Sequence, residues 1–171
     1  MSRTQPNELK RRYDLMGWGS LGLVAVLGTV CGLSLIGCGP MKARANEDSA
    51  IQSVRTIVQA QMMYASTYPA NGYACDLKAL GGVAGSGTPT PTAAQLLDND
   101  LASSGHKSGY NFAISDCVKV TVNAADRITG YVLTAVPASP GKTGNRGFCT
   151  DESGQIKFDP TGGANCTQTL Q

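Results

Sequence analysis

An uncharged apolar run over residues 15–38 constrains this chain more than any other feature of its sequence. A helix rises 1.5 Å per residue, so about 20 apolar residues cross the hydrocarbon core of a bilayer. The residues just before the run, 10–12, are Lys-Arg-Arg. Because basic flanks stay cytoplasmic, we expect a cytoplasmic leader (1–14), a single transmembrane helix (15–38) and an exported domain (41–171).

The exported part is long enough for one domain of ordinary size. The 171-residue chain carries 14 Lys and Arg against 12 Asp and Glu, a net charge of +2. Because the positive and negative charges nearly balance, no basic face for nucleic acid is indicated, and we expect no nucleic-acid partner. No cofactor motif is present, and we expect no cofactor.

The six cysteines fall into two groups. Cys31 and Cys38 lie inside the apolar run, whereas the exported part contains four widely spaced cysteines: Cys75, Cys117, Cys149 and Cys166. Zinc sites use closely spaced cysteine pairs, which these four do not form. We therefore expect no metal site but two disulfides in an oxidising compartment, and the spacing leaves all three connectivities open.

Residues 41–66 are predicted to form a helix, because apolar residues recur at intervals of three and four. Gly39 and Pro40 before it are expected to interrupt or kink the chain, since proline lacks an amide donor. The predicted apolar stripe contains Ala50, Ile51, Val54, Val58, Met62 and Ala65. The predicted polar face contains Arg44, Glu47, Asp48, Gln52, Arg55 and Gln59.

The middle of the chain is predicted to hold a helical turn (76–80), an exposed loop rich in Gly, Thr and Pro (81–92), and a short helix (93–103). In that short helix Leu96, Leu97 and Leu101 are expected to face inward.

The last third of the chain has β-strand character. We predict strands at 110–120, 131–136, 146–151 and 155–159, with Tyr110, Phe112 and Ile114 on one face of the first. Residues 152–154 supply a hairpin turn that ends in glycine. The expected fold class is α+β, a long N-terminal helix packed on a small antiparallel sheet.

The chain resembles bacterial type IV pilin-like proteins and the pseudopilins of type II secretion. Three stretches carry the resemblance: ARANEDSAIQSVRTIVQAQMMYASTYPANGYAC, SGHKSGYNF and PGKTGNRGFCTDESGQIKFDPTGG. The resemblance implies a single-pass protein of the bacterial inner membrane with a periplasmic or extracellular head. Its partners would be membrane lipid and other pilin-like subunits, in a homo- or hetero-oligomer assembled through the N-terminal helix. It also implies a disulfide between Cys149 and Cys166, which leaves Cys75 for Cys117.

Two routes for N-terminal processing stay open. In the family, prepilin peptidase cuts after a glycine; the best match here is Gly17 followed by Trp18, with Gly22 at the position of the family's glutamate. Residues 35–38, Leu-Ile-Gly-Cys, instead match a lipobox, which would attach lipid to Cys38. That alternative describes a lipoprotein, or a membrane-tethered binding domain that does not polymerise.

We find no arrangement of residues typical of an enzyme, such as the nucleophile motif G-x-S-x-G. The only histidine, His106, is expected in an exposed loop. Asp151, Glu152 and Asp159 could suggest a calcium loop, but they lack EF-hand spacing and we interpret them as carboxylates of turns. The sequence therefore favours a structural subunit over a catalyst.

Overall fold

A computed structural model describes residues 38–122 and 124–170 of the chain. The predicted leader, almost all of the predicted transmembrane helix, and Gly17 and Trp18 lie outside this part. Residues 39–171 cluster as one compact unit. Its elements, in chain order, are α2 (Cys38–Thr67), α3 (Leu77–Leu80), α4 (Asn99–Ser104), β1 (His106–Lys107), β2 (Tyr110–Val122), β3 (Ala125–Pro137), β4 (Gly147–Asp151), β5 (Lys157–Asp159) and β6 (Gln168–Thr169).

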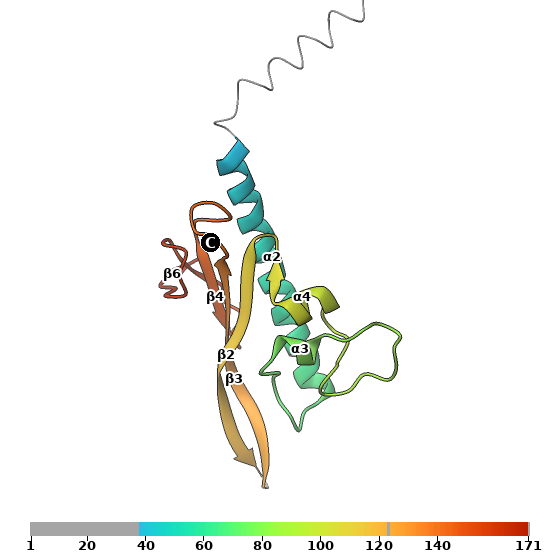
Figure 1. Cartoon of the computed structure of the whole chain (residues 1–171). Coiled ribbons are helices and arrows are strands. Elements are labelled where there is room, and N and C mark those ends of the chain that lie inside the picture. The colour runs from blue at the N-terminus through green and yellow to red at the C-terminus, as the bar shows by residue number, and fades with distance from the viewer. Residues whose placement is uncertain (1–37, 123, 171) are drawn as a thin grey trace, which may run out of the picture. The chain divides into compact units, whose positions relative to one another are not determined.

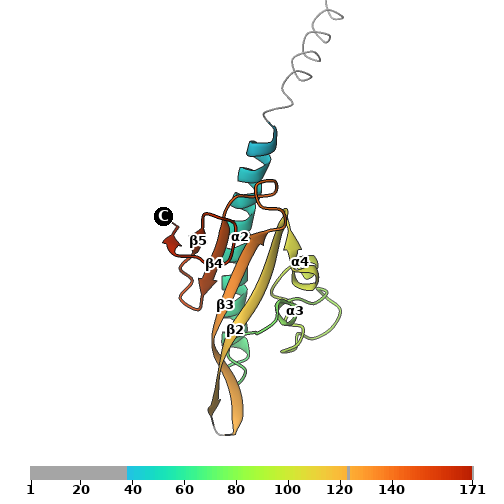
Figure 2. The same cartoon turned by 60° about the vertical axis from the view of Figure 1, so that its left-hand side comes forward.

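The architecture is α+β, as the sequence predicts. All six strands form one antiparallel sheet in the order β1-β2-β3-β4-β5-β6, so each strand pairs with its neighbours in sequence. Helix α2 runs along the sheet, and α3 and α4 lie beside the C-terminal half of α2 (Figure 1). Viewed from a second direction, α2 lies behind β3 and β4 (Figure 2).

Helix α2 confirms the predicted helix and corrects its buried face. Ala50, Ile51 and Val54 are buried as expected, but Met62 is 57% exposed. The buried stripe continues instead through Ile57, Ala60, Gln61 and Tyr64. The prediction followed four-residue steps from Val54, whereas a period of 3.6 residues returns to the same face at Ile57 and Gln61.

The expected break at Gly39 and Pro40 is not found within α2, which includes both residues. Proline is tolerated in a first helical turn, because the amide hydrogen that it lacks has no partner within the helix there.

The sheet presents one apolar face to α2. Phe112 pairs with Ala135 and Ile114 with Leu133 across β2 and β3, so alternate residues of both strands point the same way. Phe112, Leu133 and Ala135 are buried in a core shared with α2, and the half-buried Ile114 packs against it. The predicted inward face of the first strand is therefore confirmed.

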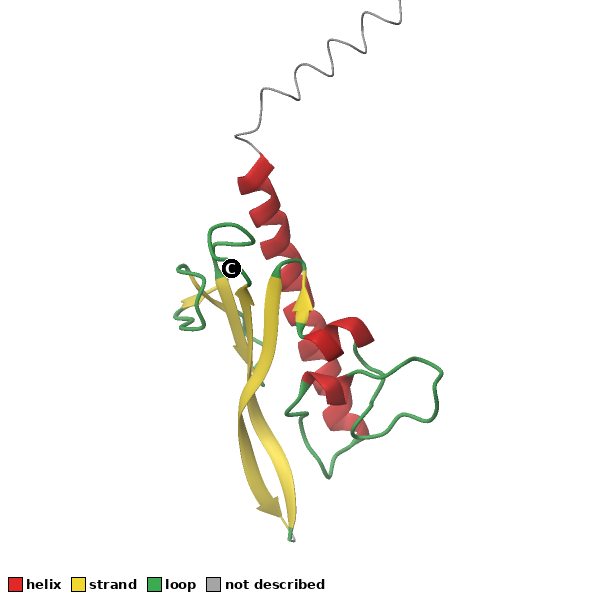
Figure 3. Cartoon of the chain, in the orientation of Figure 1, coloured by secondary structure: helices red, strands yellow, loops and turns green. Residues whose placement is uncertain are grey.

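Strands β2 and β3 continue beyond the region covered by α2 as a two-stranded ribbon, which we call the arm (residues 116–122 and 125–130; Figure 3). The predicted second strand began only at Tyr131, so the first half of β3 was missed. That half lacks apolar alternation; it is held instead by pairing with β2 and by polar contacts from Asp126 to Thr121 (2.8 Å) and Lys119 (3.2 Å).

The predicted helix over residues 93–103 is wrong in its first half. Residues 94–97 are not helical; their four amides donate to the backbone carbonyls of residues 79–81, Gln95 has a positive φ of 56°, and α4 begins only at Asn99. Asp98 is the N-cap, and its side chain accepts a hydrogen bond from the Leu101 amide at 3.1 Å. Aspartate favours a cap over a helix interior, which explains why the helix starts here. Leu97 and Leu101 are buried as predicted, and Leu96 is half-buried.

The C-terminal hairpin is confirmed. β4 pairs with β5, and the turn between them ends at Gly154, whose φ of 73° suits glycine. The prediction missed β6, a two-residue strand that pairs with β5.

Gln61 is a buried polar residue on α2, with 0% of its surface exposed. Its side chain donates to the Ala74 carbonyl (2.7 Å) and accepts from the Ala74 amide (2.8 Å), which ties the helix to the following loop. We expect Gln61→Leu to lower the free energy of unfolding by about 2–3 kcal/mol, because it leaves two buried backbone groups unpaired. Gln59→Leu, at an exposed position on the same helix, is the matched control for urea unfolding. Equal effects of the two substitutions would contradict the assignment.

Candidate functional site

Four hydrogen bonds join the first half of α2 to the loop before β4. We call this contact the clasp (Asn46, Glu47, Thr143, Asn145 and Arg146). Glu47 is 4% exposed and accepts hydrogen bonds from the backbone amides of Asn145 (2.7 Å) and Arg146 (3.3 Å). Its second oxygen accepts from the Arg146 guanidinium at 2.8 Å. The Asn46 side chain donates to the Thr143 carbonyl at 2.8 Å.

Aromatic residues of the sheet contact the Arg146 residue of the clasp. The Arg146 guanidinium lies 5.4 Å from the ring centre of Phe148 and 5.3 Å from that of Phe158, within the range of cation–π attraction. The fully buried Tyr110 donates its hydroxyl to the Arg146 carbonyl at 2.8 Å. The loop is thus fixed from both the helix and the sheet.

Sequence reasoning placed Glu47 on the polar face of the helix, and this was wrong. Glu47 lies four residues after Ala43 and three before Ala50, and both alanines are buried. The helical spacing alone therefore places it on the buried face. What the sequence did not reveal is Arg146, a partner 99 residues away.

Three carboxylates with lowered pKa values, one of them in the clasp, predict that acid destabilises the fold. Burial raises the pKa of Glu47, but the hydrogen bonds from the Asn145 amide and Arg146 outweigh it, so the net pKa lies below its ordinary 4.5. Hydrogen bonds from Thr161 lower the pKa of Asp159, and those from Ser153 lower that of Asp151, both below 3.8. A lowered pKa gives stability that is complete above the unfolded-state pKa and is lost as the pH falls through the folded-state pKa. We expect the urea midpoint to be level from pH 7 to about 5 and to fall below about pH 4.5. A midpoint that rises on acidification would contradict this.

The structure pairs all four cysteines of residues 39–171. Disulfides join Cys75 to Cys117, with Cα atoms 6.1 Å apart, and Cys149 to Cys166, with Cα atoms 5.9 Å apart. This is the connectivity that the resemblance implied.

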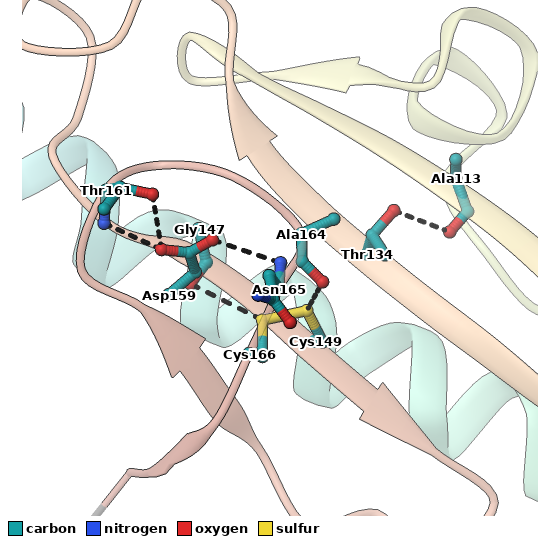
Figure 4. Close-up of a disulfide and its surroundings, with 9 residues drawn as sticks. All are labelled: Ala113, Thr134, Gly147, Cys149, Asp159, Thr161, Ala164, Asn165 and Cys166. Carbon is teal, nitrogen blue, oxygen red and sulfur yellow. Dashed lines mark hydrogen bonds between the residues drawn. A yellow bond between two sulfur atoms is a disulfide. The ribbon is translucent and has the colours of Figure 1, made fainter.

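The second disulfide closes a loop around Asp159 (Figure 4). The Asp159 carboxylate accepts from the Thr161 amide (2.8 Å), the Thr161 hydroxyl (2.6 Å) and the Asn165 amide (3.1 Å). A cation would need acceptor oxygens at this position, whereas the neighbours of Asp159 present donors. Asp151 likewise accepts from the Ser153 amide. Both are therefore carboxylates that stabilise turns.

Cys38 and His106 are the other described residues that were considered from the sequence. Cys38 is the first residue of α2. His106 is exposed, in the short strand β1 rather than in a loop, and its Nδ1 lies 2.9 Å from the side-chain oxygen of Asn111. Within the described residues, no three His, Cys, Asp or Glu side chains lie close enough to hold a metal ion.

The outward side of α2 is the other surface of note. It combines polar residues with large apolar side chains that are well exposed: Met41 (74%), Met62 (57%) and Met63 (56%). On the arm, Val118 (55%) and Val120 (42%) are exposed as well. Exposed apolar side chains in such number are common where a surface contacts a partner.

Comparisons with known protein families, with curated proteins and with solved structures found no match to this chain. Among the helices at residues 38–122 and 124–170, none is both long and apolar enough to cross a membrane. Apart from Cys38, the apolar run on which the anchor prediction rests lies before these residues.

Proposed function

We propose that this chain is a structural subunit without catalytic activity, anchored in a membrane by residues 15–38 and assembled with other subunits through its N-terminal helix. The observation that carries the proposal is the position of α2. This 30-residue helix begins at Cys38, where the apolar run ends, and packs one face on an antiparallel sheet. A pilin-like subunit of a type IV pilus or a type II secretion system has this order of parts.

The outward side of α2 supports assembly. An apolar helix that leaves the lipid needs contact with other apolar helices, and a filament core made of such helices provides it. Met62 and Met63 give α2 an exposed apolar surface that would continue the same contact beyond the membrane. Methionine suits such a role because its flexible side chain adapts to irregular partner surfaces.

The second candidate is a lipoprotein, or a tethered binding domain, that does not polymerise. Two features of the sequence favour it: the lipobox that ends at Cys38, and Gly22 in place of the glutamate that sets subunit register in the family. The described fold serves either candidate, since both place residues 39–171 outside the membrane.

Mass spectrometry of the mature N-terminus, on chain purified from the membrane fraction, separates the candidates. A new N-terminus at a methylated Trp18 supports the pilin route, a diacylated Cys38 supports the lipoprotein, and an intact leader supports a simple anchor. Recovery of the chain from the soluble cytosol with reduced thiols would contradict both proposals.

A further inference from the structure

The fold gathers basic side chains where α2 begins. Lys42 and Arg44 lie in the first two turns of α2, and Lys142 lies in the loop before β4. The clasp brings the segments that carry them together: Asn46, one turn after Lys42, donates to the carbonyl of Thr143, the neighbour of Lys142. Arg44 lines the same hollow as Asn145. We call the exposed residues Lys42, Arg44 and Lys142 the basic rim. Figures 1 and 2 both draw the loop that carries Lys142 beside the first turns of α2.

The basic rim takes part in no ion pair among the described residues. The described residues form two ion pairs, Lys119–Asp126 and Arg146–Glu47, and neither includes a rim residue. Two acidic side chains line the hollow beside Arg44: Glu47, which pairs with Arg146, and the exposed Asp48. Of the other acidic side chains among the described residues, Asp76, Asp98, Asp100, Asp116 and Asp126 lie in or beside α3, α4 and the arm, and Asp151, Glu152 and Asp159 lie in or beside β4 and β5. The rim therefore presents a local positive charge to solvent.

The position of the rim indicates its partner. If residues 15–38 cross the bilayer, as the proposed function holds, Lys42 follows the run by four residues, a rise of about 6 Å. The polar headgroup layer on each side of the hydrocarbon core is of similar thickness. Met41 beside it, with 74% of its surface exposed, suits an environment that is apolar on one side and wet on the other.

We infer that the basic rim docks onto anionic phospholipid headgroups of the bilayer that anchors the chain. This inference rests on the proposed membrane anchor and adds a second contact between head and membrane. Each basic side chain near an anionic surface strengthens binding about fivefold. Lys142 matters most, because only the fold brings it to the membrane. The docking would fix the tilt of the head, and with it the direction in which the outward side of α2 faces its neighbours.

The test measures the rate of lysine acylation by mass spectrometry on the full chain. The chain is reconstituted into lipid nanodiscs of neutral phosphatidylcholine, or of the same lipid mixed with phosphatidylglycerol. We expect Lys142 and Lys42 to react at least fivefold more slowly in the anionic discs, with the difference lost in 1 M salt. Lys78 on α3 is the internal control and should react alike in both discs.

Two exposed-residue variants complete the test. Arg44→Glu should abolish the lipid-dependent protection of Lys142, whereas Lys78→Glu should leave it intact. A chain that enters neutral discs, but whose Lys142 reacts equally in both lipids, overturns the docking inference alone. A chain that enters neither disc overturns the membrane anchor, and the docking inference with it.

Discussion

Replacing Cys75 and Cys117 together by serine should lower the free energy of unfolding of residues 39–171 by about 4 kcal/mol. The two cysteines are separated by 42 positions, against 17 for Cys149 and Cys166. In the chain-entropy account a longer closed loop restricts the unfolded chain more strongly, so removing the second disulfide should cost less, about 3 kcal/mol. Urea unfolding of the two double mutants and the parent compares them directly.

The geometry around Cys117 gives this disulfide a second role. Asp116 has a φ of 48°, and the register between β2 and β3 shifts between Ser115 and Val118. Such a bulge turns the strand locally and re-aims its side chains. Here it lies at the base of the arm, where Cys117 bonds to Cys75. We therefore expect the double mutant to lose protection from hydrogen exchange first in the arm. If Cys75, Cys117, Cys149 and Cys166 of the denatured but unreduced parent chain react with a thiol reagent, the two disulfides are absent and this account is contradicted.

Glu47→Ala should lower the free energy of unfolding by about 3 kcal/mol. The substitution leaves the Asn145 amide without its acceptor and the Arg146 guanidinium without its charge partner. Breaking a buried ion pair costs about 3–5 kcal/mol, and we place this case at the lower end. The reason is that the Arg146 side chain is 34% exposed and can regain water.

Two variants define what Glu47 contributes. Glu47→Gln keeps an acceptor for the Asn145 amide but removes the charge, so it should cost less than alanine. It should also reduce the loss of stability below about pH 4.5, to which Asp151 and Asp159 still contribute. Asp48→Ala changes the next residue, which is exposed, and should alter stability by less than about 0.5 kcal/mol. Similar effects of Glu47→Ala and Asp48→Ala in urea unfolding would show that the clasp does not hold the helix to the loop.

Local patterns in the sequence were enough for the fold class. Helical spacing identified α2, and the alternation of Tyr110, Phe112 and Ile114 identified the inner face of β2, because each pattern reflects burial against one neighbour. The elements that were missed or misplaced depend on distant contacts. The first half of β3 is held by its pairing with β2, and residues 94–97 stay out of the helix because their amides bond to residues 79–81.

The candidate sites likewise contain parts that local sequence patterns could predict and parts that depend on distant contacts. The four cysteines could be recognised from composition and spacing, whereas the choice among three connectivities needed the family resemblance. The helical spacing of Glu47 could have revealed its burial. Its bond to Arg146, and the approach of Lys142 to the start of α2, join residues about 100 positions apart, and no local pattern records such contacts.

Site-specific photo-crosslinking in living cells tests the central claim, that the chain is an assembly subunit, most directly. A photoreactive residue in place of Met62, on the outward side of α2, is compared with one in place of Asp100 on α4. Both positions are exposed. The account predicts adducts with a second copy or with another pilin-like subunit from position 62, and fewer from position 100. Monomer alone from both positions would contradict it.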